Sequence, residues 1–162
     1  MMWVIRAGRD SVYYKEFLDN QRVYLSWEDF KYDLSKIAGM PGYRSLVEQE
    51  KGSVNRSSIS NWAGQLNAFV KVIAEGDYVL IPSQGSKSYC VAKIIGAYEF
   101  DEANKYGLYH SRKIRALIKG IPRNIFSQEV VYSLGAYRTI FIAHHEEEII
   151  RSIKKWKENR RG

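Results

Sequence analysis

The chain has 162 residues, and its 25 Lys and Arg against 18 Asp and Glu give a formal net charge of +7. This length fits one domain, and a composition of 45% hydrophobic and 27% charged residues excludes a disordered chain. The single cysteine, Cys90, excludes an internal disulfide, and no apolar run reaches the roughly 18 residues of a membrane span. The first ten residues, interrupted by Arg6 and Arg9, lack the apolar run of a secretory signal. We therefore expect a cytoplasmic protein.

The positive charge is the first indication of a partner. A strongly basic protein is drawn to polyanions because binding releases the counterions of phosphates. Aromatic residues make up 14% of the chain, which leaves some rings available to a binding surface. Nucleic acid is therefore the expected partner. A basic surface that serves solubility or an anionic partner protein is the alternative that composition leaves open.

The first third of the chain predicts a strand, a short helix and a second strand. Residues 3–7 form an apolar run that ends at Gly8, and a brief helix follows it. Residues 23–27 alternate as a half-buried strand should. After them, Gly39 and Gly52 separate stretches that predict short helical pieces.

The clearest element is an amphipathic helix that begins after Ser57 and Ser58 and ends before Gly76. Its apolar residues repeat with helical spacing, and they are Ile59, Trp62, Ala63, Leu66, Phe69, Val70 and Ile73. One face of this helix is therefore expected to pack on the core.

Strands dominate the next part of the chain. Residues 77–82 and 89–100, joined by a polar turn that contains Gly85, predict a β-hairpin. Residues 110–119 alternate again, with basic side chains on one face. Residues 138–143 predict a further strand.

A second amphipathic helix ends the chain. Its apolar stripe comprises Ile149, Ile150, Ile153 and Trp156. Acidic residues fill its first turn and basic residues its end, which is the order that complements a helix dipole. The elements together predict an α+β fold, with a small curved β-sheet or partly open β-barrel flanked by helices. Residues 1–143 form the expected domain, and residues 144–162 a helix and basic tail that could link to an effector domain.

The sequence lacks the usual patterns of catalysis and of metal binding. His110, His144 and His145 have no cysteine or carboxylate at metal-ligand spacing. There is no phosphate-binding glycine loop, no dinucleotide fingerprint and no nucleophile elbow. Acidic residues do not cluster as a metal-dependent nuclease requires. We therefore expect a protein that is not an enzyme and that carries no metal and no cofactor.

Five short motifs carry a resemblance to a known family. They are IRAG in the first strand, YLSW at residues 24–27, DLS at 33–35, NWAGQL at 61–66 and GDYVLIP at 76–82. In this order the chain resembles the N-terminal recognition domain found ahead of Mrr-type nuclease domains in bacterial restriction systems. That domain is similar to the EVE and YTH modules of the PUA-like group, which bind DNA or RNA. The resemblance extends from Trp3 to about Ile142.

The resemblance implies a fold and a role for particular residues. It implies a PUA-like (EVE/YTH-like) domain over residues 1–143. In EVE domains an Asn near the start of the main helix precedes a Gly-Asp strand opening, and Asn61 stands here before Gly76 and Asp77. In YTH domains a Trp after the second strand helps to form an aromatic cage, and Trp27 holds a similar place. The chain departs from YTH modules in its long stretch between Trp27 and Asn61.

These considerations give two sets of candidate residues. Those expected to form a base pocket are Ser26, Trp27, Asn61, Trp62, Tyr109 and His110. Those expected to contact the nucleic-acid backbone are Arg6, Arg9, Arg112, Lys113 and Arg115. The position of Trp62 on the apolar stripe favours the core over a stacking role, whereas Trp27 fits either.

The function expected from the sequence is that of a DNA-binding module in phage defence. It flips a modified, methylated base into an aromatic pocket and directs a restriction nuclease or helicase located in another domain or subunit. The alternative is an RNA-binding PUA-like (EVE) protein that acts on transfer RNA or other modified RNA. A third interpretation is an enzyme whose active-site residues are dispersed along the chain, and no sequence motif supports it.

Overall fold

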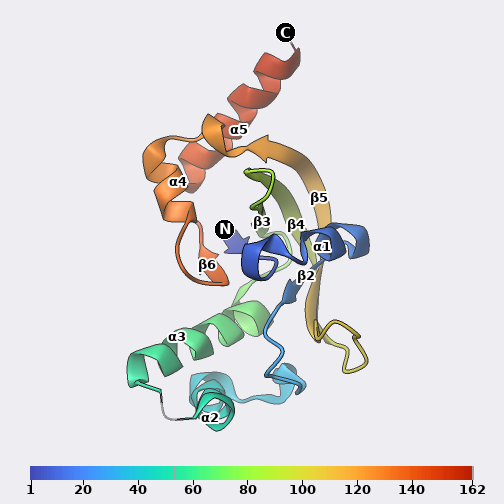
Figure 1. Cartoon of the computed structure of the whole chain (residues 1–162), viewed down its shortest axis with the longest axis vertical. Coiled ribbons are helices and arrows are strands. Elements are labelled where there is room, and N and C mark those ends of the chain that lie inside the picture. The colour runs from blue at the N-terminus through green and yellow to red at the C-terminus, as the bar shows by residue number, and fades with distance from the viewer. Residues whose placement is uncertain (53, 162) are drawn as a thin grey trace.

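The computed structural model describes residues 1–52 and 54–161, and within them six strands and five α-helices (Figure 1). The strands are β1 (Met2–Ile5), β2 (Arg22–Leu25), β3 (Tyr78–Ser83), β4 (Ser88–Phe100), β5 (His110–Pro122) and β6 (Ile140–Ile142). The helices are α1 (Tyr14–Asn20), α2 (Gly39–Lys51), α3 (Arg56–Asn67), α4 (Gln128–Leu134) and α5 (Glu146–Arg161). The α+β class expected from the sequence is confirmed.

The strands form one open, mixed sheet in the order β2-β5-β4-β3-β1-β6, so that β2 and β6 are its edges. β1 and β3 are parallel, and the other neighbouring pairs are antiparallel. The register of β4 against β5 shifts at three places, and both strands are 13 residues long. Such irregularities let long strands bend, and Figure 1 shows β5 curving around the molecule.

The predicted hairpin is present as β3 and β4, which pair from Tyr78 with Lys93 to Ser83 with Ser88. Burial differs between the two halves of β4. Residues 89–92 are all buried, whereas further along Ile94 is buried and Ile95 is exposed. Because successive side chains of a strand point to opposite faces, the first half of β4 is covered on both faces and the second half on one.

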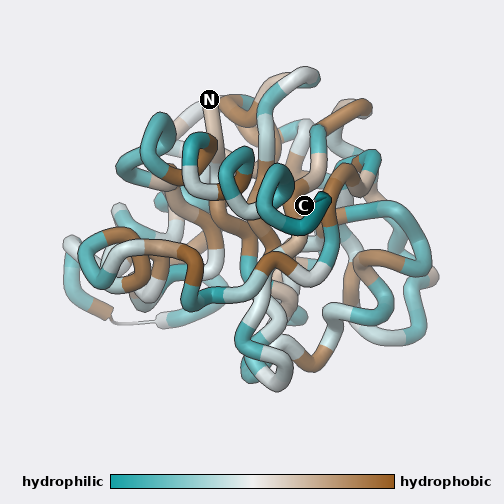
Figure 2. Tube along the Cα trace, turned by 90° about the horizontal axis from the view of Figure 1, so that it is seen from above, coloured by the Kyte–Doolittle hydropathy of each residue, from teal (hydrophilic) through white to brown (hydrophobic). Residues whose placement is uncertain are grey.

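Two hydrophobic clusters cover the two faces of the central strands. Trp3 and Ile5 of β1 belong to a cluster with residues of α1, α2 and α3, whereas Val4 belongs to a second cluster with residues of α4 and α5. Burial on both faces is what a central strand of a layered α/β arrangement requires. Figure 2 shows hydrophobic residues concentrated along the strands in the middle of the molecule.

The helices differ in detail from the sequence expectation. α3 begins earlier than Ser57, because the side chain of Asn55 caps it by accepting from the N–H of Ser58 at 2.8 Å. It continues as one π-helical stretch over Ala68–Val72. The short pieces expected around Gly39 form one helix of 13 residues, α2. α4 was not expected at all, and it is capped by the hydroxyl of Ser127.

The C-terminal helix α5 packs on the sheet through its first half. Ile149 and Ile153 are buried in the second cluster, as the predicted stripe requires. The basic tail expected over residues 144–162 includes Gly162, which lies outside the described residues. None of the helices described in the structure is long and apolar enough to cross a membrane.

Candidate functional site

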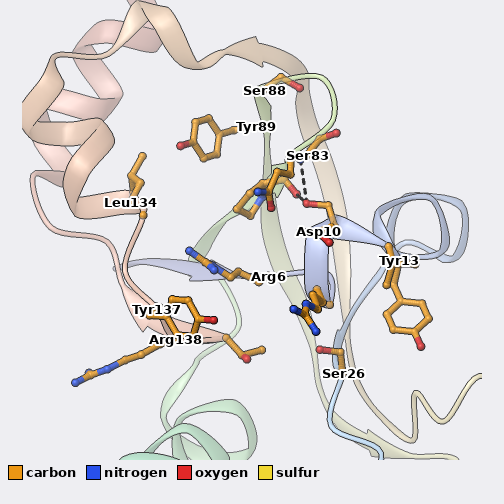
Figure 3. A pocket seen from close by; sticks show the side chains of 18 of the residues that line it. Arg6, Asp10, Tyr13, Ser26, Ser83, Ser88, Tyr89, Leu134, Tyr137 and Arg138 are labelled. Carbon is orange, nitrogen blue, oxygen red and sulfur yellow. Dashed lines mark hydrogen bonds between the residues drawn. The ribbon is translucent and has the colours of Figure 1, made fainter.

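A cavity of about 980 Å³ opens beside the sheet where several loops meet (Figure 3). Its walls come from the segment after β1, the segment after β2, the β3–β4 turn, the residue after β5 and the loop between α4 and β6. Ligand pockets in proteins typically have volumes of about 300–1,000 Å³. The cavity therefore has room for a ligand of nucleotide size.

Basic side chains dominate the charged groups around the cavity. They are Arg6, Arg9, Lys87, Arg123 and Arg138, against the two carboxylates of Asp10 and Glu28. Among the described residues, none of the five cations forms an ion pair or a side-chain hydrogen bond. Among the described Lys and Arg residues, Lys15, Arg22 and Lys51 are the ones that pair with carboxylates, so an unpaired cation is common in this protein. What distinguishes the cavity is that five such cations gather around one hollow with only two carboxylates.

Four aromatic residues also line the cavity, and they are Tyr13, Trp27, Tyr89 and Tyr137. Burial raises the pKa of Tyr89, while the charges of Arg123 and Arg6 oppose that shift. Both guanidinium groups therefore act on the phenol. Figure 3 shows Arg6 and Tyr89 projecting between the strands and the end of α4, which carries Leu134.

The backbone around the cavity is strained at three residues that are not glycine. Asp10, Ser11 and Lys87 have φ angles of 54°, 60° and 49°, in the left-handed region. Ser11 also holds the two strained loops together, because its Oγ donates to the carbonyl of Pro82 and accepts from the N–H of Gln84, both at 3.0 Å. Strained backbone concentrates at binding and active sites in proteins, where the surrounding structure maintains it.

Trp27 forms one wall of the cavity, and its orientation is fixed on two sides. Its indole N–H donates to Oγ1 of Thr139 at 3.1 Å. Its ring packs against Phe30 and Trp62, with centroids 5.9 and 6.4 Å away. Ser26, the preceding residue, lines the cavity as well. These two candidates of the expected base pocket therefore lie together at the cavity.

The other two candidates on the main helix do not line the cavity. Trp62 packs behind Trp27, and the Nζ of Lys51 lies 4.8 Å from its ring centroid. The side-chain oxygen of Asn61 accepts from Gln65 at 3.2 Å. Trp62 therefore supports the wall from behind, as its place on the apolar stripe favours.

Gln65 of α3 is buried behind the cavity and holds Thr139, a residue of the cavity wall. Its Oε1 accepts from the N–H groups of Thr139 and Ile140, at 3.1 and 3.0 Å. The side chain is 6% exposed. A buried amide oxygen without a partner would cost free energy, so these two hydrogen bonds are maintained. They hold the start of β6 against α3.

His110 is a core residue, which corrects its assignment to the base pocket. It is fully buried, and its Nε2–H donates to the carbonyl of Phe30. A carbonyl only accepts, so Nδ1 is the unprotonated nitrogen and accepts from the hydroxyl of Tyr98 at 2.6 Å. Burial lowers the pKa of His110 to about 4. Tyr109, its neighbour, is half-buried and does not line the cavity.

Arg112 is also buried, which corrects its assignment to the phosphate-binding surface. Its side chain is 3% exposed and donates to the carbonyls of Gly96, Phe69 and Ile73, at 2.8, 3.0 and 2.8 Å. Desolvation lowers the pKa of this guanidinium. Arg112 therefore satisfies the carbonyls at the end of the π-helical stretch and is closed to a ligand.

The remaining backbone candidates fall into two groups. Arg6 and Arg9 line the cavity, beside the end of β1. Lys113 and Arg115 are exposed on β5 and do not line it. The structure thus separates two pairs of basic residues that the sequence alone places together.

Sequence reasoning missed much of the cavity lining. The missed basic and aromatic residues are Tyr13, Lys87, Tyr89, Arg123, Tyr137 and Arg138. A signal for some of them exists, because Arg123 follows the end of β5 and Arg138 precedes β6 directly beside a tyrosine. Within residues 1–52 and 54–161, no group of three or more His, Cys, Asp or Glu side chains is arranged to hold a metal ion.

Fold and cavity together define an α+β protein with a basic, aromatic-lined cavity at one side of its sheet. Residues 3–138 match the family described as "Domain of unknown function (DUF8426)", and the chain belongs to that family. No curated protein matches the chain.

Proposed function

We propose that the protein binds nucleic acid at this cavity, with a base inside it and the phosphate backbone along its basic rim. The observation that carries the proposal is the group of five cationic side chains, none paired with a carboxylate among residues 1–52 and 54–161, around a cavity lined by four aromatic rings. The proposal includes no catalytic step by this chain.

The chemistry of the lining residues suits the two parts of a nucleotide. Arginine forms bidentate hydrogen bonds with phosphate oxygens, and four of the five cations are arginines. Aromatic faces stack on a base, and each stacked base contributes about 1–3 kcal/mol. A base that leaves a duplex costs a few kcal/mol in lost pairing and stacking, so a cavity that accepts it must return a similar amount.

The finer proposal is a PUA-like module that recognises a modified base in DNA and directs a nuclease or helicase in another domain or subunit. The resemblance of the motifs to the recognition domains of restriction systems supports DNA. Trp27 supports the aromatic pocket, because it lies at the cavity wall in an orientation fixed by Thr139. Binding of RNA is the second candidate, because stacking and phosphate contacts serve both nucleic acids.

The test is direct binding of the 162-residue protein to fluorescently labelled oligonucleotides. The probes are one duplex sequence that is unmodified or carries a central 5-methylcytosine, 5-hydroxymethylcytosine or N6-methyladenine, and the matching single-stranded DNA and RNA. We expect the tightest binding to one of the modified duplexes. The apparent Kd should rise at least about tenfold between about 50 and 200 mM salt, because phosphate contacts release counterions.

A matched pair of double variants tests the place of binding. Arg6→Ala with Arg123→Ala removes two cations from the cavity, whereas Lys113→Ala with Arg115→Ala removes two from the exposed face of β5. The first variant should lose at least about tenfold in affinity and the second much less. Equal losses would place the nucleic acid elsewhere, and no binding of any probe by the wild-type protein would end the proposal.

A further inference from the structure

Tyr137 is an aromatic residue that the fold leaves entirely in solvent. Its side chain is 100% exposed, and it lies in the loop between α4 and β6. It also lines the cavity, and its neighbour Arg138 is one of the five cations of the rim. Figure 3 shows the Tyr137 ring and the extended Arg138 side chain together on this loop.

The loop is firmly held two residues beyond Tyr137. Thr139 accepts from the indole of Trp27 through Oγ1, donates its N–H to Gln65, and accepts from the N–H of Arg6 through its carbonyl at 2.9 Å. On the other side, the N–H of Gly135 donates to the carbonyl of Tyr132 and ends α4. The backbone on both sides of Tyr137 is therefore held by hydrogen bonds, while the ring itself projects into solvent at the rim of the cavity.

We propose that Tyr137 is a wedge that inserts into duplex DNA beside the base that enters the cavity. This inference rests on the proposed function, since it requires a base drawn out of a duplex. A base that leaves the stack opens a gap, and apolar or aromatic side chains that insert between base steps fill such gaps. Tyr137 supplies the ring next to the cavity, and Arg138 supplies a charge for the adjacent phosphate.

The wedge acts only where a duplex has to be opened, and this property separates it from a residue that contacts the base inside the cavity. A cavity contact contributes to binding of paired and unpaired strands alike. A wedge contributes to binding of the paired duplex and little to binding of a strand that is already open. The ratio of the two affinities is therefore the informative quantity.

The experiment compares Tyr137→Ala with Tyr132→Ala on three forms of the same DNA. Tyr132 is the matched control, because its side chain is 86% exposed on α4 and does not line the cavity. The DNA is the tightest-bound duplex of the set above, the same strand opposite an abasic site, and the strand alone. Tyr137→Ala should weaken binding of the paired duplex at least about fivefold and change the other two less than about twofold. Tyr137→Phe should bind like the wild-type protein, because it keeps the ring.

Several outcomes would overturn the wedge. One is an equal loss on all three DNAs, which would make Tyr137 a contact within the cavity. Others are a loss no larger than that of Tyr132→Ala and an unchanged affinity for the paired duplex. Thermal melting of both variants should match the wild type, since neither ring is packed. Failure of the wild-type protein to bind any of the DNA and RNA probes would end the proposed function and the wedge with it. Binding of RNA but not DNA, or normal binding of DNA with one of the outcomes above, would end the wedge alone.

Discussion

The indole N–H of Trp27 donates to the hydroxyl of Thr139 across 112 positions of sequence. Trp27 follows β2 and Thr139 precedes β6, and these are the two edge strands of the sheet. The hydrogen bond therefore joins segments from opposite edges, which the bent sheet brings together at the cavity. It also fixes the plane of an aromatic ring in the cavity wall.

Replacing Thr139 with Val should release the Trp27 ring from its fixed orientation in the cavity wall and cause only a small loss of stability. Valine keeps the shape of threonine but removes the acceptor for the Trp27 indole. We expect the free energy of unfolding to fall by about 1 kcal/mol, the usual value of one hydrogen bond, as measured by urea denaturation. Binding of the preferred duplex should weaken more than stability alone explains. Thr139→Ser, which keeps the hydroxyl, should behave like the wild type, and identical behaviour of the Val and Ser variants would contradict the role of the bond.

Replacing Arg112 with Met should destabilise the protein strongly. The change leaves the carbonyls of Phe69, Ile73 and Gly96 without their donor in a buried place. Hydrogen bonds to a charged donor contribute about 1.5–3 kcal/mol each, so we expect the free energy of unfolding to fall by at least about 3 kcal/mol. Arg115→Met on the same strand is the control. Because the Arg115 side chain is exposed, this change should alter the free energy of unfolding by no more than about 0.5 kcal/mol. Similar melting of the two variants would remove the structural role of Arg112.

The protein should lose stability as the pH falls from about 6.5 to about 4, in part because of His110. Burial lowers the pKa of His110 from 6.5 to about 4. Within this window the unfolded chain takes up a proton on His110 that the folded protein does not. The contribution of His110 to the free energy of unfolding is therefore complete above pH 6.5. It decreases by up to about 3 kcal/mol as the pH falls to about 4.

The variant His110→Gln separates this effect from that of carboxylates. Glutamine does not titrate, so the stability of the variant should fall less steeply between these two pH values, whatever its absolute stability. The measurement is urea denaturation across the pH range for both proteins. Parallel curves would mean that His110 titrates alike in the folded and unfolded chain.

Cys90 should be unreactive in the folded protein. Its side chain is fully buried on β4, and burial raises the pKa of the thiol to about 11. Thiolate is the nucleophile, so a thiol-specific reagent at mildly alkaline pH should label the folded protein far more slowly than the protein in denaturant. The measurement is the rate of labelling with and without denaturant. Rapid labelling without denaturant would show that β4 opens locally.

The sequence by itself determined most of the secondary structure. The hairpin of β3 and β4 and the apolar stripes of α3 and α5 follow from local periodicity, which depends only on the side chains of one segment. Periodicity also predicts the burial of Arg112. It lies two residues before Ile114 on β5, and residues two apart share a face, so the alternation itself assigns Arg112 to the core side rather than to the basic side with Lys113.

Only the tertiary structure decided which partners the buried polar side chains have and which polar side chains line the cavity. His110 and Arg112 are buried because Phe30, Tyr98 and the end of the π-helical stretch, all distant in sequence, supply their partners. The cavity is built from five separate segments, and they meet because the sheet bends and brings its two edges within reach of one hydrogen bond. Local patterns carry no information on that bend, which arises from the twist of the long strands and from the register shifts between β4 and β5.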